Sequence, residues 1–205
     1  MRRRRSFLRD ESGGPAAEFA LVLPLILILL LGIIDAGRLA WEINKAEKAT
    51  QTGARWAAAT DMIADELADY SFAVGSGVLA GTPVGTTDFE QIECSQPAST
   101  VICDCEGGPC DFGDGANPDA FADLVDRMAD IKPDIAAANV IVEYRNSGLG
   151  FAGDPNGPDV APIISVRLRD LDFVPLTLML FRGTIDLPDF SYSLTMEDGA
   201  GDWSN

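Results

Sequence analysis

Residues 19–34 read FALVLPLILILLLGII, a run of sixteen uncharged and almost entirely apolar residues. Sixteen residues make about 24 Å of α-helix, and adding residues 16–18 brings the helix to about 28 Å, close to the thickness of a bilayer core. Large aliphatic side chains occupy every face of this helix, whereas an amphipathic helix of a soluble protein keeps a polar stripe. The stretch therefore predicts a transmembrane helix, and a buried core helix is the alternative.

Charge is distributed unevenly on the two sides of this stretch. The 205-residue chain has 15 basic and 32 acidic side chains and a net charge of −17. Residues 1–13 form a basic leader with five arginines and two acids, so the leader carries +3 and the remainder −20. Positive charge before a span favours a cytoplasmic N-terminus and places residues 35–205 outside the cytoplasm. A cleaved signal peptide would also have a basic head, but no A-x-A-like exit follows this long stretch.

The composition also excludes several classes of function. The chain has no histidine, which excludes Ser-His and Cys-His nucleophile pairs and every His-ligated metal site. The acidic excess argues against nucleic acid as a partner, because phosphate contacts need a basic surface. No phosphate-binding glycine loop opens a helix here. We therefore expect neither an enzyme nor a cofactor, although a pair of carboxylates as in glycosidases stays open, since their separation in space decides.

Helical character continues beyond the apolar stretch. Pro15 suits a first helical turn, and the helix is expected to run from Pro15 to about Thr60, or to Tyr70 in a longer reading. Gly53 is a point at which it could break. Small and apolar residues recur at helical spacing and would let another element approach closely: Leu39, Ile43, Ala46, Ala49 and Ala54. Residues 14–70 are thus expected to form a transmembrane and stalk helix.

The start of the helix reads RDESGGPAAEFALVLP, residues 9–24. This resembles the class III signal of type IV pilin-like proteins, in which a prepilin peptidase cuts after a glycine and leaves glutamate fifth in the mature chain. Counted from Gly14, Glu18 is fifth and Phe19 sixth, so the resemblance implies a cut between Gly13 and Gly14. More narrowly, GPAAEFALVLP resembles the TadE/TadG-like pseudopilins of Tad (tight-adherence) pilus systems, as do ATQTGARWAAA at residues 49–59 and the late LTMED.

Two readings of Glu18 remain open. A carboxylate at a helix start is stabilised by the helix dipole and the free N–H groups there. The other reading follows from the resemblance. If the chain is cut, Gly14 gains an ammonium, and Glu18 of a neighbouring helix would pair with it and set the register between subunits. An acid inside a membrane usually has such a partner.

The four cysteines lie close together, at Cys94, Cys103, Cys105 and Cys110. Cys103 and Cys105 are too near in sequence to pair without strain, which leaves 94–103 with 105–110, or 94–105 with 103–110. Disulfides agree with a position outside the cytoplasm. A zinc site of four cysteines is the alternative, although C-x-C and C-x4-C fit zinc poorly.

Oxygen-bearing side chains gather after the last cysteine, at Asp111, Asp114, Asn117 and Asp119. They make a weak calcium candidate, because calcium takes carboxylates and carbonyls in a flexible loop. Turn chemistry explains the same residues. The order does not fit an EF-hand, so we expect no metal here as the main reading.

The remaining chain predicts an α+β domain at residues 71–205 with a Cys-rich loop. Asn117 and Pro118 start a second helix, with Phe121, Leu124, Val125, Met128 and Ile131 facing the core and the aspartates at 119, 123, 126 and 130 facing water. Strands are expected at 140–144, 162–168 and 190–196, and residues 175–181 as a fourth strand or a short helix. The expected fold is a long N-terminal transmembrane helix followed by a small antiparallel sheet with a packed helix, which is pilin-like.

These observations and the resemblance together imply a minor pseudopilin or pilus-assembly component of a Tad-type IV pilus system. It would act by helix packing and subunit docking in the bacterial inner membrane, as a single-pass protein with a cytoplasmic N-terminus and a periplasmic C-terminal domain, or on the pilus after processing. The implied partners are the lipid bilayer, prepilin peptidase and other pilin or pseudopilin subunits. The alternative is a membrane-anchored ligand-binding or adhesive domain that enters no filament.

Overall fold

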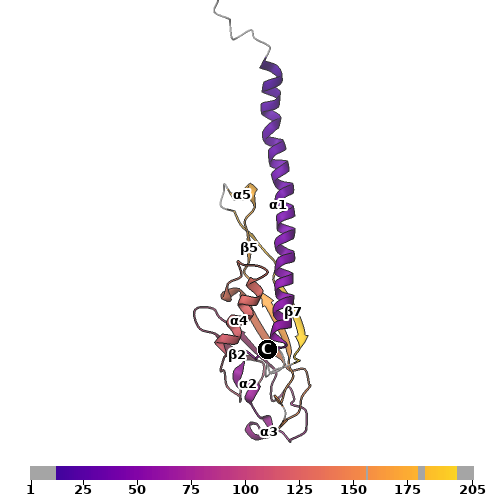
Figure 1. Cartoon of the computed structure of the whole chain (residues 1–205), viewed down its shortest axis with the longest axis vertical. Helices are drawn as coiled ribbons and strands as arrows, with labels where there is room; N and C mark the ends of the chain where they lie inside the picture. Colours follow the sequence, from indigo (N-terminus) through magenta and orange to yellow (C-terminus); the bar gives the residue numbers. More distant parts are fainter. Residues whose placement is uncertain (1–12, 156, 180–182, 198–205) are drawn as a thin grey trace, which may run out of the picture. The chain divides into compact units, whose positions relative to one another are not determined.

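A computed structural model describes residues 13–155, 157–179 and 183–197 (Figure 1). The chain divides into two compact units. The first contains Met1–Trp41 and Phe173–Ile185, and the second contains Glu42–Asp172 and Asp186–Asn205. The predicted α+β class, with a long N-terminal helix and a small antiparallel sheet, is confirmed.

The helix α1 runs from Gly14 to Ala57 without interruption, with Pro24 inside it. Its residues up to Trp41 belong to the first unit and the rest to the second. The helix stops short of Thr60, and the continuation to Tyr70 is wrong, because residues 62–64 turn into the core of the second unit. There the N–H of Ile63 donates to the Tyr144 hydroxyl at 2.9 Å, and its carbonyl accepts from the backbone N–H of Asn117 at 2.7 Å.

The second unit contains a five-stranded sheet in the order β2-β1-β3-β4-β7, with every neighbouring pair antiparallel. The strands are β1 (Gln91–Ser95), β2 (Ile102–Glu106), β3 (Val140–Arg145), β4 (Ile163–Leu168) and β7 (Phe190–Thr195). Three of them match the expected strands within one residue at either end. The hairpin of β1 and β2 was missed, since this region was expected to be a Cys-rich loop.

Alternation along these strands sends one set of side chains into the core. The register places Ile92, Tyr144 and Ile164 side by side across three strands, and all three are buried. Tyr144 is fully buried, and its hydroxyl is satisfied by the Ile63 N–H described above. Burial raises the pKa of the Tyr144 hydroxyl far above its ordinary value, so this group stays neutral.

The helix α4 (Pro118–Ala129) packs against α1 within the second unit. As expected, Asn117 caps it: its side-chain oxygen accepts from the backbone N–H groups of Asp119 and Ala120. Phe121, Leu124 and Met128 of the expected stripe are buried, while Val125 and Ile131 are half-buried. The four aspartates of the other face are exposed, as predicted.

Small residues on α1 make this close packing work. Ala46, Ala49 and Ala54 are fully buried, as the small-residue face predicted. Gly53 does not break the helix. A Cβ at this position would lie 2.7 Å from the sulfur of Met128, so glycine lets the two helices approach.

The shorter elements complete the fold. They are the helices α2 (Asp65–Asp69) and α3 (Phe72–Gly75), a 3₁₀ turn at Ala137–Asn139, the two-residue strands β5 (Asp172–Phe173) and β6 (Ile185–Asp186), and the helix α5 (Leu176–Met179). β5 and β6 pair with each other. The apolar segment expected as a strand or short helix is thus a short helix, and it belongs to the unit that contains the first part of α1.

Candidate functional site

The predicted processing site lies where α1 begins. Gly13 immediately precedes the helix, Gly14 is its first residue, and Pro15 occupies the first turn, as expected. A Cβ built on Gly13 or on Gly14 would meet no described atom within 4 Å. The fold of the described chain therefore places no requirement for glycine at either position.

Glu18 and Phe19 lie one turn further along. Both are exposed, and the Phe19 side chain keeps 62% of its surface accessible. The ion pairs found within the described part of the chain do not include Glu18. The structure thus leaves the carboxylate available to a group outside these residues, and both readings of Glu18 stay predictions.

The apolar stretch that follows is exposed, as far as the described residues go. Among the described residues, α1 is the one helix long and apolar enough to cross a membrane, and its most apolar window contains no buried residue. A core helix would be covered by its own chain, so the reading as a buried core helix finds no support. Exposed large side chains occur all along the stretch, among them Leu21, Leu25, Ile28, Leu29 and Ile33.

Asp35, the first charged residue after this stretch, is buried and binds the short helix α5. Its carboxylate accepts from the backbone N–H of Leu176 at 2.7 Å and from that of Thr177 at 2.8 Å. It also accepts from the Thr177 hydroxyl at 2.8 Å. These are free donors of a first helical turn, so Asp35 acts as a cap supplied by another segment of the chain.

Arg38 completes this contact one turn later on α1. Its guanidinium donates to Asp35 at 3.2 Å and to the Val174 carbonyl at 3.4 Å, and it lies 5.2 Å from the centre of the Phe173 ring. The residues Phe173 to Thr177 therefore run along α1 from Arg38 toward Asp35, that is, toward the apolar stretch. Figure 1 shows α5 beside α1.

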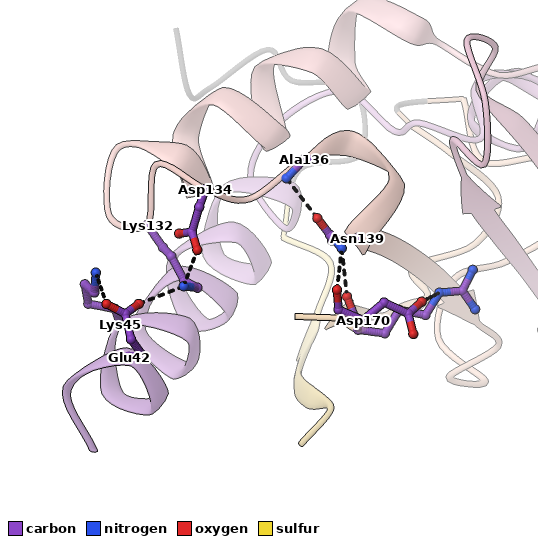
Figure 2. A network of polar contacts seen from close by, with 8 residues as sticks. Glu42, Lys45, Lys132, Asp134, Ala136, Asn139 and Asp170 are labelled. Atoms are coloured by element: carbon purple, nitrogen blue, oxygen red, sulfur yellow. Dashed lines mark hydrogen bonds and ion pairs between the residues drawn. The ribbon is translucent and has the colours of Figure 1, made fainter. Parts of the chain in front are cut away.

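A buried cation lies in the second unit, between α1 and the segment after α4. Figure 2 shows the Lys132 ammonium between Glu42 and Asp134, 2.8 Å from an oxygen of each. The Lys132 side chain is 1% exposed, and Lys45 lies 2.9 Å from the other oxygen of Glu42. Burial disfavours the charged amine, but the hydrogen bonds to Asp134 and Glu42 outweigh it and raise the pKa of Lys132.

Asn139 orders the chain that enters β3, as Figure 2 also shows. Its side-chain amide donates to the carbonyls of Arg169 and Asp170, at 3.1 and 3.0 Å, and its oxygen accepts from the N–H of Ala136 at 3.0 Å. Asp170 has a φ of 55°, a left-handed conformation that few residues other than glycine adopt. The side chain of Asn139 thus holds together two segments some thirty residues apart.

The four cysteines form two disulfides, Cys94–Cys103 and Cys105–Cys110, which is one of the two pairings left open by the sequence. Cys94 and Cys103 are direct partners across the β1–β2 hairpin. All four cysteines are described and none is free. The disulfides hold the strand at the edge of the sheet and the loop that leads toward α4.

The calcium candidates do not converge on a site. Asn117 uses its side-chain oxygen as the cap of α4, and Asp111 contacts the Ser76 hydroxyl at 3.4 Å. Within the part of the chain that the structure describes, no group of three or more Cys, Asp or Glu side chains is placed to hold a metal ion. Capping chemistry accounts for Asn117.

The sequence reasoning missed the roles of Asp35 and Lys132. Asp35 carried a signal, since it is the first charge after sixteen uncharged residues and is followed by Arg38. The burial of Lys132 had no evident signal, because Asp134 is its near partner but Glu42 lies ninety positions away.

Among known proteins, similarity is found for the N-terminal part of the chain. The search of curated proteins and the search of solved structures each returned no match. Residues 13–55 match the family model of TadE, described as TadE-like protein. The match spans nearly all of α1 and confirms the resemblance drawn from GPAAEFALVLP. Residues 13–55 of this chain are therefore similar to the TadE-like family.

Proposed function

We propose that this protein is a minor pseudopilin, or a pilus-assembly component, of a Tad-type pilus. The observation that carries the proposal is the TadE match over residues 13–55, which coincides with a helix whose apolar stretch is left uncovered by the residues that the structure describes. TadE-like proteins are structural pilus components, so the function proposed is packing and docking and not catalysis. The uncovered helix would associate with lipid and with helices of other pilus subunits.

Processing by a prepilin peptidase would precede that role. Glycine at residues 13 and 14 serves no packing purpose within the described chain, since a Cβ at either position would meet open space. A requirement for glycine would therefore come from outside the fold. A peptidase that binds an extended backbone supplies one, and cleavage between Gly13 and Gly14 would leave Glu18 as the fifth residue.

Glu18 would then set the register between subunits. It is exposed at the start of α1, and a carboxylate in lipid is costly without a partner. The new ammonium of Gly14 on a neighbouring subunit is such a partner. Phe19, also exposed, would pack between helices at the same level.

The orientation proposed has a cytoplasmic N-terminus in the bacterial inner membrane and a periplasmic domain at residues 71–205. Five arginines precede the apolar stretch, which is the bias expected of a cytoplasmic end. The two disulfides support the same orientation, because they persist in an oxidising compartment.

The mature N-terminus tests the processing step. The full chain is produced in cells with and without an active prepilin peptidase, and the N-terminal peptide is identified by mass spectrometry. We expect a start at Gly14 only with the active enzyme. Gly13→Leu should abolish the cut, whereas Gly37→Leu, which also faces open space on α1, should not. An intact Met1 in both strains would favour the membrane-anchored domain that enters no filament.

Glu18→Ala tests the packing role. If Glu18 pairs between subunits, the variant should still insert in the membrane but be lost from assemblies isolated through a tagged major pilin. Glu47→Ala is a matched control, since Glu47 is an exposed acid of the same helix in the second unit. Equal recovery of Glu18→Ala and Glu47→Ala would show that Glu18 only stabilises the helix start.

A further inference from the structure

The segment 173–179, FVPLTLM, presents four exposed apolar residues. Phe173 and Pro175 are buried and Thr177 is half-buried, while the other four residues are exposed. The exposed fractions are 48% for Val174, 41% for Leu176, 38% for Leu178 and 67% for Met179. No residue of the segment is charged, which is unusual for an exposed loop of a protein with a net charge of −17.

The contacts of Asp35 and Arg38 set the level of this segment along α1. Val174 contacts Arg38, and Leu176 and Thr177 contact Asp35, so the chain advances toward the apolar stretch as it enters α5. Asp35 directly follows that stretch, whose last residue is Ile34. The exposed side chains of α5 therefore lie where the apolar stretch ends.

The polar groups of this contact are arranged as a lipid environment requires. Backbone donors close to hydrocarbon must be satisfied within the protein. The first two N–H groups of α5 are satisfied by Asp35, and the Leu178 carbonyl accepts from Gly183 at 3.2 Å. The exposed Trp41 lies about 10 Å beyond Ile34 along the helix, a level at which tryptophan is enriched in membrane proteins.

From this geometry we propose that residues 174–179 form a second membrane contact, a shallow apolar wedge that inserts into the bilayer leaflet beside α1. The wedge is continuous with the lipid-facing surface of the helix, and it belongs to the same compact unit. The inference rests on the proposed membrane position of α1. Its occupant is phospholipid, bound through exposed apolar side chains as in interfacial segments of other proteins.

Spin labels measure this contact in the full chain. Met179→Cys is labelled without reductant, so that both disulfides stay intact, and the protein is reconstituted in phosphatidylcholine vesicles. Accessibility to oxygen, which partitions into lipid, is compared with accessibility to a water-soluble nickel chelate present on both sides. Ile28→Cys is the reference for lipid, with a wild-type exposure of 65%, and Val74→Cys is the reference for water, with 86%.

We expect the ratio of oxygen to nickel accessibility at residue 179 to be several-fold above that at Val74 and below that at Ile28. A ratio equal to that at Val74 would overturn the proposal. Protection from both reagents with spin–spin broadening would also overturn it, because a second copy would then cover the segment. If Ile28 itself matches Val74, α1 does not cross the bilayer, and the proposed function fails instead.

A second variant tests whether Asp35 holds residues 174–179 at the membrane. Asp35→Ala removes the acceptor of three hydrogen bonds from α5 and should lower the ratio at residue 179 toward that at Val74, with the ratio at Ile28 unchanged. An unchanged ratio at residue 179 would overturn the role of Asp35 in holding the wedge at the membrane.

Discussion

Replacing Lys132 by methionine should destabilise the second unit while nearly keeping the side-chain volume. The substitution removes an ammonium that is 1% exposed and that donates to Glu42 and Asp134, both at 2.8 Å. Each hydrogen bond to a charged group contributes about 1.5–3 kcal/mol. The acceptors are 26% and 60% exposed, so water replaces part of what is lost. Relief of the buried charge acts in the opposite direction.

The net expectation is a loss of about 1–2 kcal/mol in the free energy of unfolding. Urea unfolding of the full chain in a mild detergent, followed by tryptophan fluorescence, measures it as a lower midpoint at unchanged slope. Lys45→Met is the control, because Lys45 is 28% exposed and pairs with the half-buried Glu42, so it should cost about 0.5 kcal/mol or less. A Lys132→Met protein as stable as the wild type would refute the reasoning, since desolvation would then cancel the hydrogen bonds.

The same variant should change the pH dependence of stability. Burial would lower the pKa of Lys132, but its two carboxylate partners raise it above 10.5, so its contribution is complete below 10.5 and is lost as pH rises through the folded pKa. Burial would raise the pKa of Asp134, but the Lys132 hydrogen bond lowers it below 3.8, so that contribution is lost as pH falls through the lowered value. The difference in the free energy of unfolding between the wild type and Lys132→Met should be constant near neutral pH. It should vanish in strong acid and in strong alkali. A gap that persists in strong alkali would contradict this.

Three further substitutions test the packing of the second unit by the same unfolding measurement. Gly53→Val should cost about 1–3 kcal/mol, because its Cβ would lie 2.7 Å from the Met128 sulfur. Gly37→Val is the control and should cost nothing, because Gly37 faces open space on the same helix. Equal effects of the two substitutions would refute the role of Gly53 in helix packing. Tyr144→Phe should cost about 1–3 kcal/mol, since a buried backbone N–H loses its 2.9 Å acceptor, and a neutral result would mean that water replaces the hydroxyl. Asn117→Ala should cost about 1 kcal/mol through loss of the α4 cap, and no loss would show that the cap does not stabilise the helix.

Local patterns in the sequence were sufficient to predict the helices and strands whose signals lie within a few neighbouring residues. The run of sixteen apolar residues and Pro15 predicted α1 and its start, and Asn117, Pro118 and the spacing of Phe121, Leu124 and Met128 predicted α4. Helical hydrogen bonds join residues four apart, so these signals lie within one short window. The three six-residue strands were found for the same reason, since alternating or β-branched residues mark each of them within a short stretch.

The hairpin of β1 and β2 was missed because the residue types in this region are typical of turns and loops. Cysteine, aspartate and glycine dominate the region, and only the cross-strand partners of Ile92 and Cys94 make it a sheet. The choice between two disulfide pairings likewise depended on strand register, which places Cys94 opposite Cys103. A shift of the register by one residue would place other side chains opposite each other, and the turn residues between the two cysteines did not reveal which register forms.

The sequence by itself determined the apolar helix, its basic leader, the acidic remainder and the TadE-like start, because each is a property of consecutive residues. Only the tertiary structure decided that Asp35 binds α5, that Lys132 is buried between Glu42 and Asp134, and that Gly53 must be small to admit Met128. Apart from the contact of Lys132 with nearby Asp134, these roles arise from contacts between residues 75 to 142 positions apart. Such contacts stabilise the protein only after folding has brought the distant residues together.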